Sequence, residues 1–196
     1  MGEIKSALEL ALEKTDSVKS DRSLIVKNEA DEAGRKAAFE YLEESSIKPS
    51  SLEAKLKAAD KNNRQWVKEG MFKVLSSNLK LPEDKSSFEK IGRLKDGFAA
   101  IAEKKKEVLF LFDQIEGLYN NYLQNKTSAV EKLKNSYARK LKEKEMALSQ
   151  QLGKEVHLTP EKDPEFLDYL HKTIGQLDEQ YQEVLGKVKE ELKKRI

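Results

Sequence analysis

Residues 91–136, IGRLKDGFAAIAEKKKEVLFLFDQIEGLYNNYLQNKTSAVEKLKNS, carry the pattern that decides the fold. Apolar and aromatic residues recur every seven positions, in two series offset by three residues, and no proline interrupts them. Eleven of the fourteen positions fit: Ile91, Leu94, Phe98, Ile101, Val108, Phe112, Ile115, Tyr119, Tyr122, Ala129 and Leu133. A heptad pattern of this length is typical of a coiled coil. It predicts an all-α fold, an elongated helical bundle with a long antiparallel coiled-coil hairpin.

The composition supports long helices and argues against several kinds of chemistry. Of the 196 residues, 38% are hydrophobic and 37% are charged, which suits helices that each bury one narrow stripe. The absence of cysteine excludes disulfides, zinc–thiolate sites, iron–sulfur clusters and thiol nucleophiles. His157 and His171 are the only histidines, and neither has enough ligands nearby in sequence for a metal site.

No motif for catalysis or for cofactor binding stands out. The chain has no glycine-rich phosphate loop and no nucleophile elbow, and its carboxylates lie in helical charge patterns. We therefore expect a protein that is not an enzyme and that has no catalytic, cofactor or metal residues and no small-molecule substrate. The longest apolar run, Val108–Phe112, is far shorter than the roughly 20 residues that a membrane span needs. Because no signal peptide is visible either, we expect a cytoplasmic protein.

Apolar periodicity and helix breakers predict five helical segments. Residues 2–15 form a short amphipathic helix, which a polar break at 16–21 separates from a second helix over 22–46. A third helix spans 50–79, and a fourth segment spans 83–152. After a loop containing Pro160, Asp163 as N-cap and Pro164 at the first helical position begin a last helix.

Particular residues sharpen these predictions. Small side chains in the second helix, with Gly34 among them, allow a close approach to another helix. Ser50 and Glu53 have the spacing of a capping box at the start of the third helix. In the fourth segment, the sequence leaves open whether the helix is continuous or bends at Gly92, Gly97 or Gly117.

The predicted helices divide the chain into two parts. Residues 1–81 are predicted to hold N-terminal helices that pack on the rod, and residues 82–196 the long helix and the hairpin. Residues 118–153 carry seven Lys or Arg against three Glu, whereas 154–196 carry eight against ten Asp or Glu. Segments of opposite net charge suit antiparallel partners that share flanking ion pairs.

Part of the seam looks too apolar for the shorter N-terminal helices to cover. An exposed apolar patch of that kind marks an interface. We therefore predict a surface for a protein partner, or for a second copy in a homodimer, at six residues: Phe98, Ile101, Val108, Leu109, Phe112 and Ile115.

A basic stretch offers an alternative function. It comprises Lys132, Lys134, Arg139, Lys140, Lys142 and Lys144. Nucleic-acid binding would use this 132–144 face. The whole chain has a net charge of only +2, however, and a solvated helix face opposite the acidic last helix explains the stretch better. We therefore favour a non-enzymatic role in protein–protein interaction or scaffolding, with nucleic-acid association as the alternative.

The opening stretch Gly2–Thr15, GEIKSALELALEKT, resembles the start of uncharacterised bacterial all-helical proteins of unknown function. The helix start Asp163-Pro164-Glu165-Phe166 is similar in kind. The resemblance implies a bacterial, cytoplasmic setting and assigns no active residue.

Overall fold

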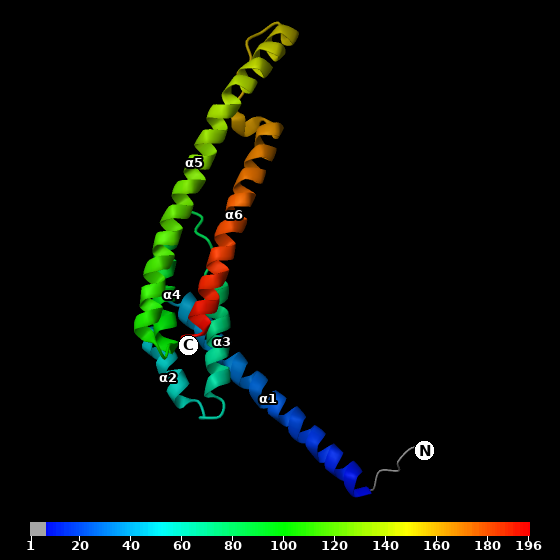
Figure 1. Ribbon diagram of the computed structural model, residues 1–196, viewed down its shortest axis with the longest axis vertical. Helices are drawn as coiled ribbons and strands as arrows, with labels where there is room; N and C mark the ends of the chain where they lie inside the picture. Colours follow the sequence, from blue (N-terminus) through cyan, green and yellow to red (C-terminus); the bar gives the residue numbers. More distant parts are fainter. Residues whose placement is uncertain (1–6) are drawn as a thin grey trace. The chain divides into compact units, whose positions relative to one another are not determined.

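The computed structural model describes the backbone of residues 7–196 and the side chains of residues 22–196. It confirms the all-α fold. The helices are α1 (Ala7–Glu43), α2 (Ser50–Ala58), α3 (Arg64–Asn78), α4 (Ser87–Ile101), α5 (Lys105–Leu152) and α6 (Pro164–Lys193), with a short 3-10 helix at Pro160–Lys162 (Figure 1). No strand occurs among the described residues.

The chain divides into two compact units, each drawn from separate stretches of sequence. Unit 1 joins the chain up to Leu79 with Lys90–Leu109 and Leu192–Ile196, and unit 2 joins Lys80–Glu89 with Phe110–Glu191. The predicted division between residues 81 and 82 stays a prediction.

Two predicted helix boundaries are wrong, and the fourth segment matches neither of the alternatives that the sequence left open. Helix α1 is continuous through residues 16–21, because the polar residues there include no proline to break it. The start of the predicted helix 2–15 lies outside the described residues. The predicted helix 50–79 is interrupted between α2 and α3, and the fourth segment is interrupted between α4 and α5 rather than at a glycine.

Tertiary hydrogen bonds accompany both interruptions. After α2, the Arg64 guanidinium donates to the carbonyl oxygens of Leu56 at 2.9 Å and Ala59 at 3.3 Å, which caps the end of that helix. Between α4 and α5, the backbone N–H groups of Glu103 and Lys104 both donate to the carbonyl oxygen of Arg195 at 3.2 Å. The predicted capping box at Ser50 does not form, since Pro49 occupies the N-cap position and no side chain caps the helix.

In unit 1, α1 and α3 pack in direct backbone contact. A Cβ atom on Gly34 would lie 1.9 Å from the carbonyl oxygen of Val67, and one on Gly70 would lie 2.1 Å from that of Asp31. Ion pairs from Asp31 to Lys73 at 2.5 Å and to Arg35 at 2.8 Å flank the crossing. The prediction that small residues bring the second predicted helix close to a neighbour is therefore confirmed.

The C-terminal end of α1 is fixed by Arg93. Its guanidinium lies 4.3 Å from the centre of the buried Tyr41 ring and donates to the carbonyl oxygens of Tyr41 and Glu44. The Tyr41 hydroxyl donates in return to the Arg93 carbonyl oxygen at 2.8 Å. These bonds satisfy carbonyl groups that a helix end leaves without partners.

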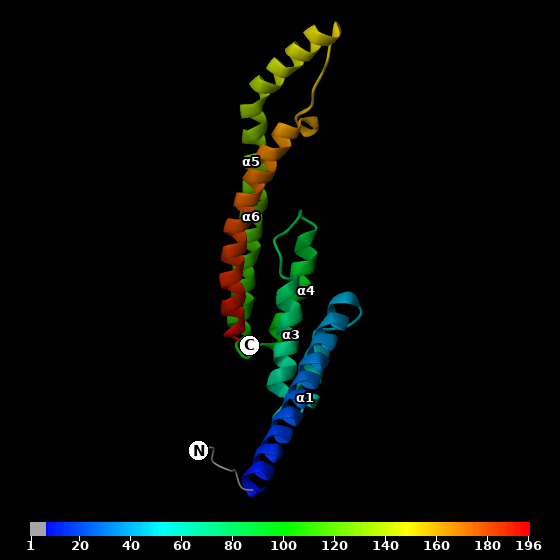
Figure 2. The ribbon, with the colours of Figure 1, turned by 90° about the vertical axis from the view of Figure 1, so that its right-hand side faces the viewer.

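In unit 2, residues later in α5 contact residues earlier in α6. Tyr122 donates to Asp178 at 2.7 Å, whereas Tyr137, farther along α5, stacks edge-on at 5.4 Å against Phe166 near the start of α6. Figures 1 and 2 show α6 running beside α5. That these helices form an autonomous antiparallel coiled-coil hairpin stays a prediction.

Candidate protein-binding surfaces

The six residues predicted as an interface lie mostly in the core. Five of them, Phe98, Ile101, Val108, Phe112 and Ile115, have exposed fractions of 2% or less, and Leu109 is half-buried. The expectation that the N-terminal helices leave these residues partly uncovered does not hold for the five buried ones. An interface between chains at these positions stays a prediction. Little of the surface of these residues is left for a partner to contact.

Contacts within unit 1 show what covers Phe98. Its ring meets that of Phe72 edge to face, with centroids 5.8 Å apart. Beside it, a Cβ on Gly97 would lie 2.8 Å from the ring of Tyr41 and 3.0 Å from Leu75. Sequence periodicity identified Phe98 as apolar and inward-facing, but it could not show that α1 and α3 supply the cover.

Other large apolar side chains are exposed. Phe110, Phe39, Ile25 and Leu24 have exposed fractions of 62%, 58%, 56% and 53%. Heptad periodicity does not identify these four, because they lie off the heptad positions or in the predicted N-terminal helices. The weak signal that could have found them is an apolar residue on the polar side of an amphipathic helix.

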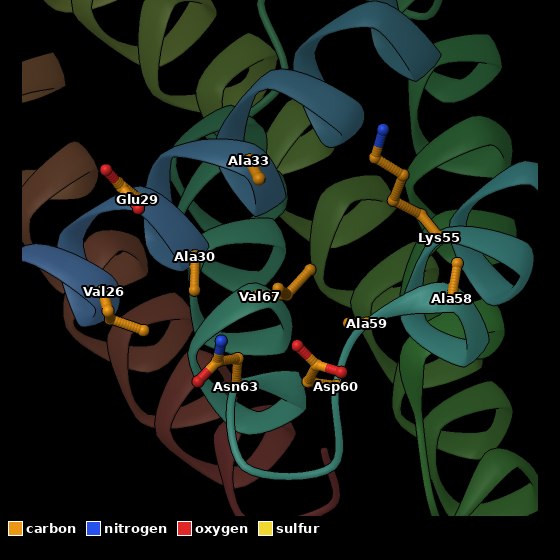
Figure 3. A pocket seen from close by; sticks show the side chains of 10 residues that line it. All are labelled: Val26, Glu29, Ala30, Ala33, Lys55, Ala58, Ala59, Asp60, Asn63 and Val67. Atoms are coloured by element: carbon orange, nitrogen blue, oxygen red, sulfur yellow. The ribbon is translucent and has the colours of Figure 1, made fainter.

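A small pocket opens between α1 and the α2–α3 connection in unit 1. It has a volume of about 350 Å³, and Figure 3 shows Ala30 and Ala33 of α1 on one side of it and Lys55 and Asp60 on the other. Four of the ten residues that line it are alanines. No group of three or more His, Asp or Glu side chains able to hold a metal ion occurs where side chains are described.

The two histidines lie apart. His157 sits 3.5 Å from Glu155, with both side chains at least 80% exposed, and His171 is exposed on α6.

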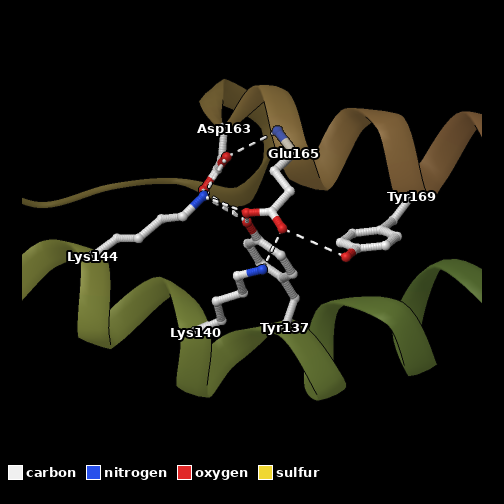
Figure 4. A network of polar contacts seen from close by, with 6 residues as sticks. All are labelled: Tyr137, Lys140, Lys144, Asp163, Glu165 and Tyr169. Atoms are coloured by element: carbon white, nitrogen blue, oxygen red, sulfur yellow. Dashed lines mark hydrogen bonds and ion pairs between the residues drawn. The ribbon is translucent and has the colours of Figure 1, made fainter.

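The basic stretch 132–144 is largely neutralised by carboxylates of unit 2. Lys134 pairs with Glu161 at 2.6 Å, and Arg139 pairs with Glu143 at 3.1 Å on the same helix. Lys140 and Lys144 bind carboxylates at the start of α6 (Figure 4). Four of the six cations therefore have a partner within the chain.

The contacts in Figure 4 form one polar network. The Lys144 ammonium lies 2.6 Å from Asp163 and 3.0 Å from Glu165, and it donates to the Tyr137 hydroxyl at 2.8 Å. The backbone N–H of Glu165 donates to Asp163 Oδ1 at 3.0 Å, so Asp163 caps α6 as predicted.

Charge and burial shift the pKa values of this network in the directions that stabilise it. Hydrogen bonds from Lys140 and then Lys144 lower the pKa of Glu165 to about 2. The hydrogen bond from Lys144 lowers the pKa of Asp163, and the same contact raises the pKa of Lys144. Burial raises the pKa of Tyr137. Lys140, Lys144, Asp163 and Glu165 therefore stay charged at neutral pH. Their ion pairs hold the start of α6 against α5.

The protein is thus all-α. In unit 1, α1 and α3 meet through close backbone contact, and in unit 2, ion pairs join α5 to the start of α6. A model of a family of unknown function, DUF6657, matches residues 53–194. The chain therefore belongs to this family, as its resemblance to uncharacterised all-helical proteins indicated. No curated protein and no solved structure matches it significantly. Across the described residues, no helix is both long enough and apolar enough to cross a membrane.

Proposed function

We propose that this chain is a non-enzymatic protein-binding or scaffolding protein of the bacterial cytoplasm. It holds a protein partner, or a second copy of itself, through the part of α1 that carries Leu24 and Ile25. One observation carries the proposal: these two neighbouring apolar side chains are each more than half exposed.

Burial along α1 changes at a definite point. No side chain in Arg22–Glu29 is buried, and Leu24 and Ile25 are each more than half exposed. Among the α1 side chains that the structure describes, the first buried ones are Ala30 and Asp31, where α1 meets α3. Figure 2 shows the N-terminal part of α1 continuing past the end of α3 within the same unit.

A helix in this situation gains stability from binding. Most helical stability in proteins comes from packing of an apolar face, and isolated helices are only marginally stable in water. Covering a Leu or Ile side chain contributes on the order of 2 kcal/mol. An adjacent Leu and Ile on an uncovered helix are therefore suited to anchor a partner.

Replacement of both side chains tests the proposal. A Leu24→Ser, Ile25→Ser variant should keep the melting temperature of the wild type, because neither side chain is buried. It should lose binding, measured as affinity capture from native lysate with quantitative mass spectrometry and as molar mass by light scattering. The matched control, Lys27→Ser with Asn28→Ser, changes two exposed polar residues of the same segment and should keep both properties. Equal capture and equal mass for the two variants would contradict the proposal.

A further inference from the structure

A second groove in unit 1, separate from Leu24 and Ile25, has a basic rim and an apolar floor. It lies between α2, the start of α3 and the α4–α5 junction, and its volume is about 640 Å³. Its lining includes five Lys or Arg and two Glu, a net charge of +3. The floor consists of Leu56 and the stretch Ala99–Ala102.

Two of the five cations have structural partners. Lys68 is buried and pairs with Glu103 at 2.7 Å, and Arg64 caps the end of α2. The other three, Lys57, Lys61 and Lys105, are exposed, and their ammonium groups form no ion pair among the described residues. The groove therefore has three lysines without a carboxylate partner among the described residues, whereas most cations of the 132–144 stretch are paired.

We propose that this groove binds an acidic, amphipathic segment of a partner protein. Carboxylates of the segment pair with Lys57, Lys61 and Lys105, and its small apolar side chains lie on the alanine-rich floor. Amphipathic helices bind grooves in this way, with apolar anchors below and charges at the rim. Complementary charge sets the orientation and accelerates encounter.

The floor distinguishes this occupant from a nucleic acid. Single strands bind through aromatic side chains that stack on bases beside a basic track. None of the residues that line the groove is aromatic, and a phosphate backbone leaves an apolar floor uncovered. An acidic protein segment satisfies both the rim and the floor.

Fluorescence anisotropy with the full-length chain tests this proposal. The probe is a labelled peptide of about 14 residues, roughly four helical turns, with Glu on one helical face and Leu and Ala on the other. Comparison probes replace every Glu by Lys, or every Leu by Ser, and a single-stranded DNA of similar length serves as the nucleic-acid probe.

Lys57→Glu with Lys61→Glu should weaken binding of the acidic peptide at least about tenfold, because two rim cations become repulsive. The control, Lys132→Glu with Lys142→Glu, makes the same charge change on exposed lysines of unit 2 and should leave the affinity unchanged. Circular dichroism should show both variants folded.

The acidic amphipathic peptide should have the highest affinity. The peptide with Lys in place of Glu (the Lys peptide) should not bind, and the peptide with Ser in place of Leu (the Ser peptide) should bind weakly. Equal weakening by the two double variants, equal binding of the Ser peptide, or tighter binding of the DNA would overturn the proposal. So would the absence of peptide binding at moderate salt. None of these results bears on Leu24 and Ile25, so the proposed function is tested separately.

Discussion

At the scale of single residues, the α1–α3 crossing depends on the hydrogen atoms of Gly34 and Gly70. Each glycine lies against a backbone carbonyl of the other helix, where a methyl group would overlap an oxygen atom. Backbone atoms cannot rotate away as the end of a flexible side chain can. The two helices would have to move apart, and the Asp31 ion pairs that flank the crossing would lengthen with them.

Gly34→Ala should therefore lower the free energy of unfolding by about 3 kcal/mol, the upper part of the range for overpacked sites. Urea denaturation followed by circular dichroism measures it. The control is Gly117→Ala in α5, where a Cβ meets nothing within 4 Å. That change should raise the stability by up to about 1 kcal/mol through helix propensity. A Gly34→Ala protein as stable as the wild type would show that the helices separate at no cost.

At the scale of elements, the polar network decides where α6 begins and ties that end to α5. Asp163 caps the first turn while its other oxygen binds Lys144, and Glu165 in the same turn binds Lys140. Acidic residues at a helix N-terminus are also favoured by the helix dipole. The local cap and the tertiary ion pairs thus stabilise the same conformation.

The network should make stability fall in acid. The pKa of Glu165 is about 2 in the folded chain against 4.5 ordinarily, and that of Asp163 is also lowered. Carboxyls with a lowered pKa stabilise the fold above the ordinary value, and this contribution is lost as the pH falls towards the folded value. The melting temperature of the wild type should therefore drop from about pH 4.5 to pH 2.

An Asp163→Asn, Glu165→Gln variant checks this prediction by thermal melting across that range. Asn keeps the capping ability of Asp, so the variant removes charge with little loss of the cap. Its melting temperature should start lower and decline less. The control, Asp168→Asn with Glu179→Gln, changes exposed α6 carboxyls that form no ion pair within the described residues, and it should follow the wild type. If the melting temperatures of all three proteins fell equally with pH, the network would not be the cause of the loss of stability in acid.

At the scale of the whole molecule, the question is which side of α5 another copy can reach. Phe112 is fully buried, whereas Phe110, two residues earlier, is 62% exposed. A homodimer that uses this part of α5 must therefore involve Phe110. Of the six residues predicted as an interface, five are buried within the chain and Leu109 is half-buried.

A dimer formed through this side of α5, as distinct from one formed through Leu24 and Ile25, should give about twice the chain mass of 22.4 kDa in light scattering of the wild type. Phe110→Glu should return the mass of one chain and melt like the wild type, because exposed substitutions change stability by only about 0.5 kcal/mol. Phe112→Glu should instead lower the melting temperature strongly, since it buries a charge without a partner. A single-chain mass for the wild type throughout the micromolar range, or an unchanged dimer with Phe110→Glu, would rule this dimer out.

Features that depend on near neighbours along the chain could be predicted from the amino-acid pattern. Heptad periodicity predicted helices over most of residues 91–136, and the Asp163-Pro164 pair predicted the start of α6 to the residue. Gly34 predicted a close helix approach. These are local properties, since a helical face or a cap is specified by residues within one or two turns.

Features that depend on residues far apart in sequence could not be predicted in this way. The break between α4 and α5 coincides with two hydrogen bonds to the carbonyl oxygen of Arg195, at the other end of the chain. Lys140 and Lys144 are neutralised while Lys57 and Lys61 are not, because the partners of a charged side chain come from whichever segment packs beside it. Periodicity shows that Phe98 and Phe112 face inward, but it does not say whether the same chain or a second one covers them. That depends on packing between helices, which no short stretch of sequence specifies.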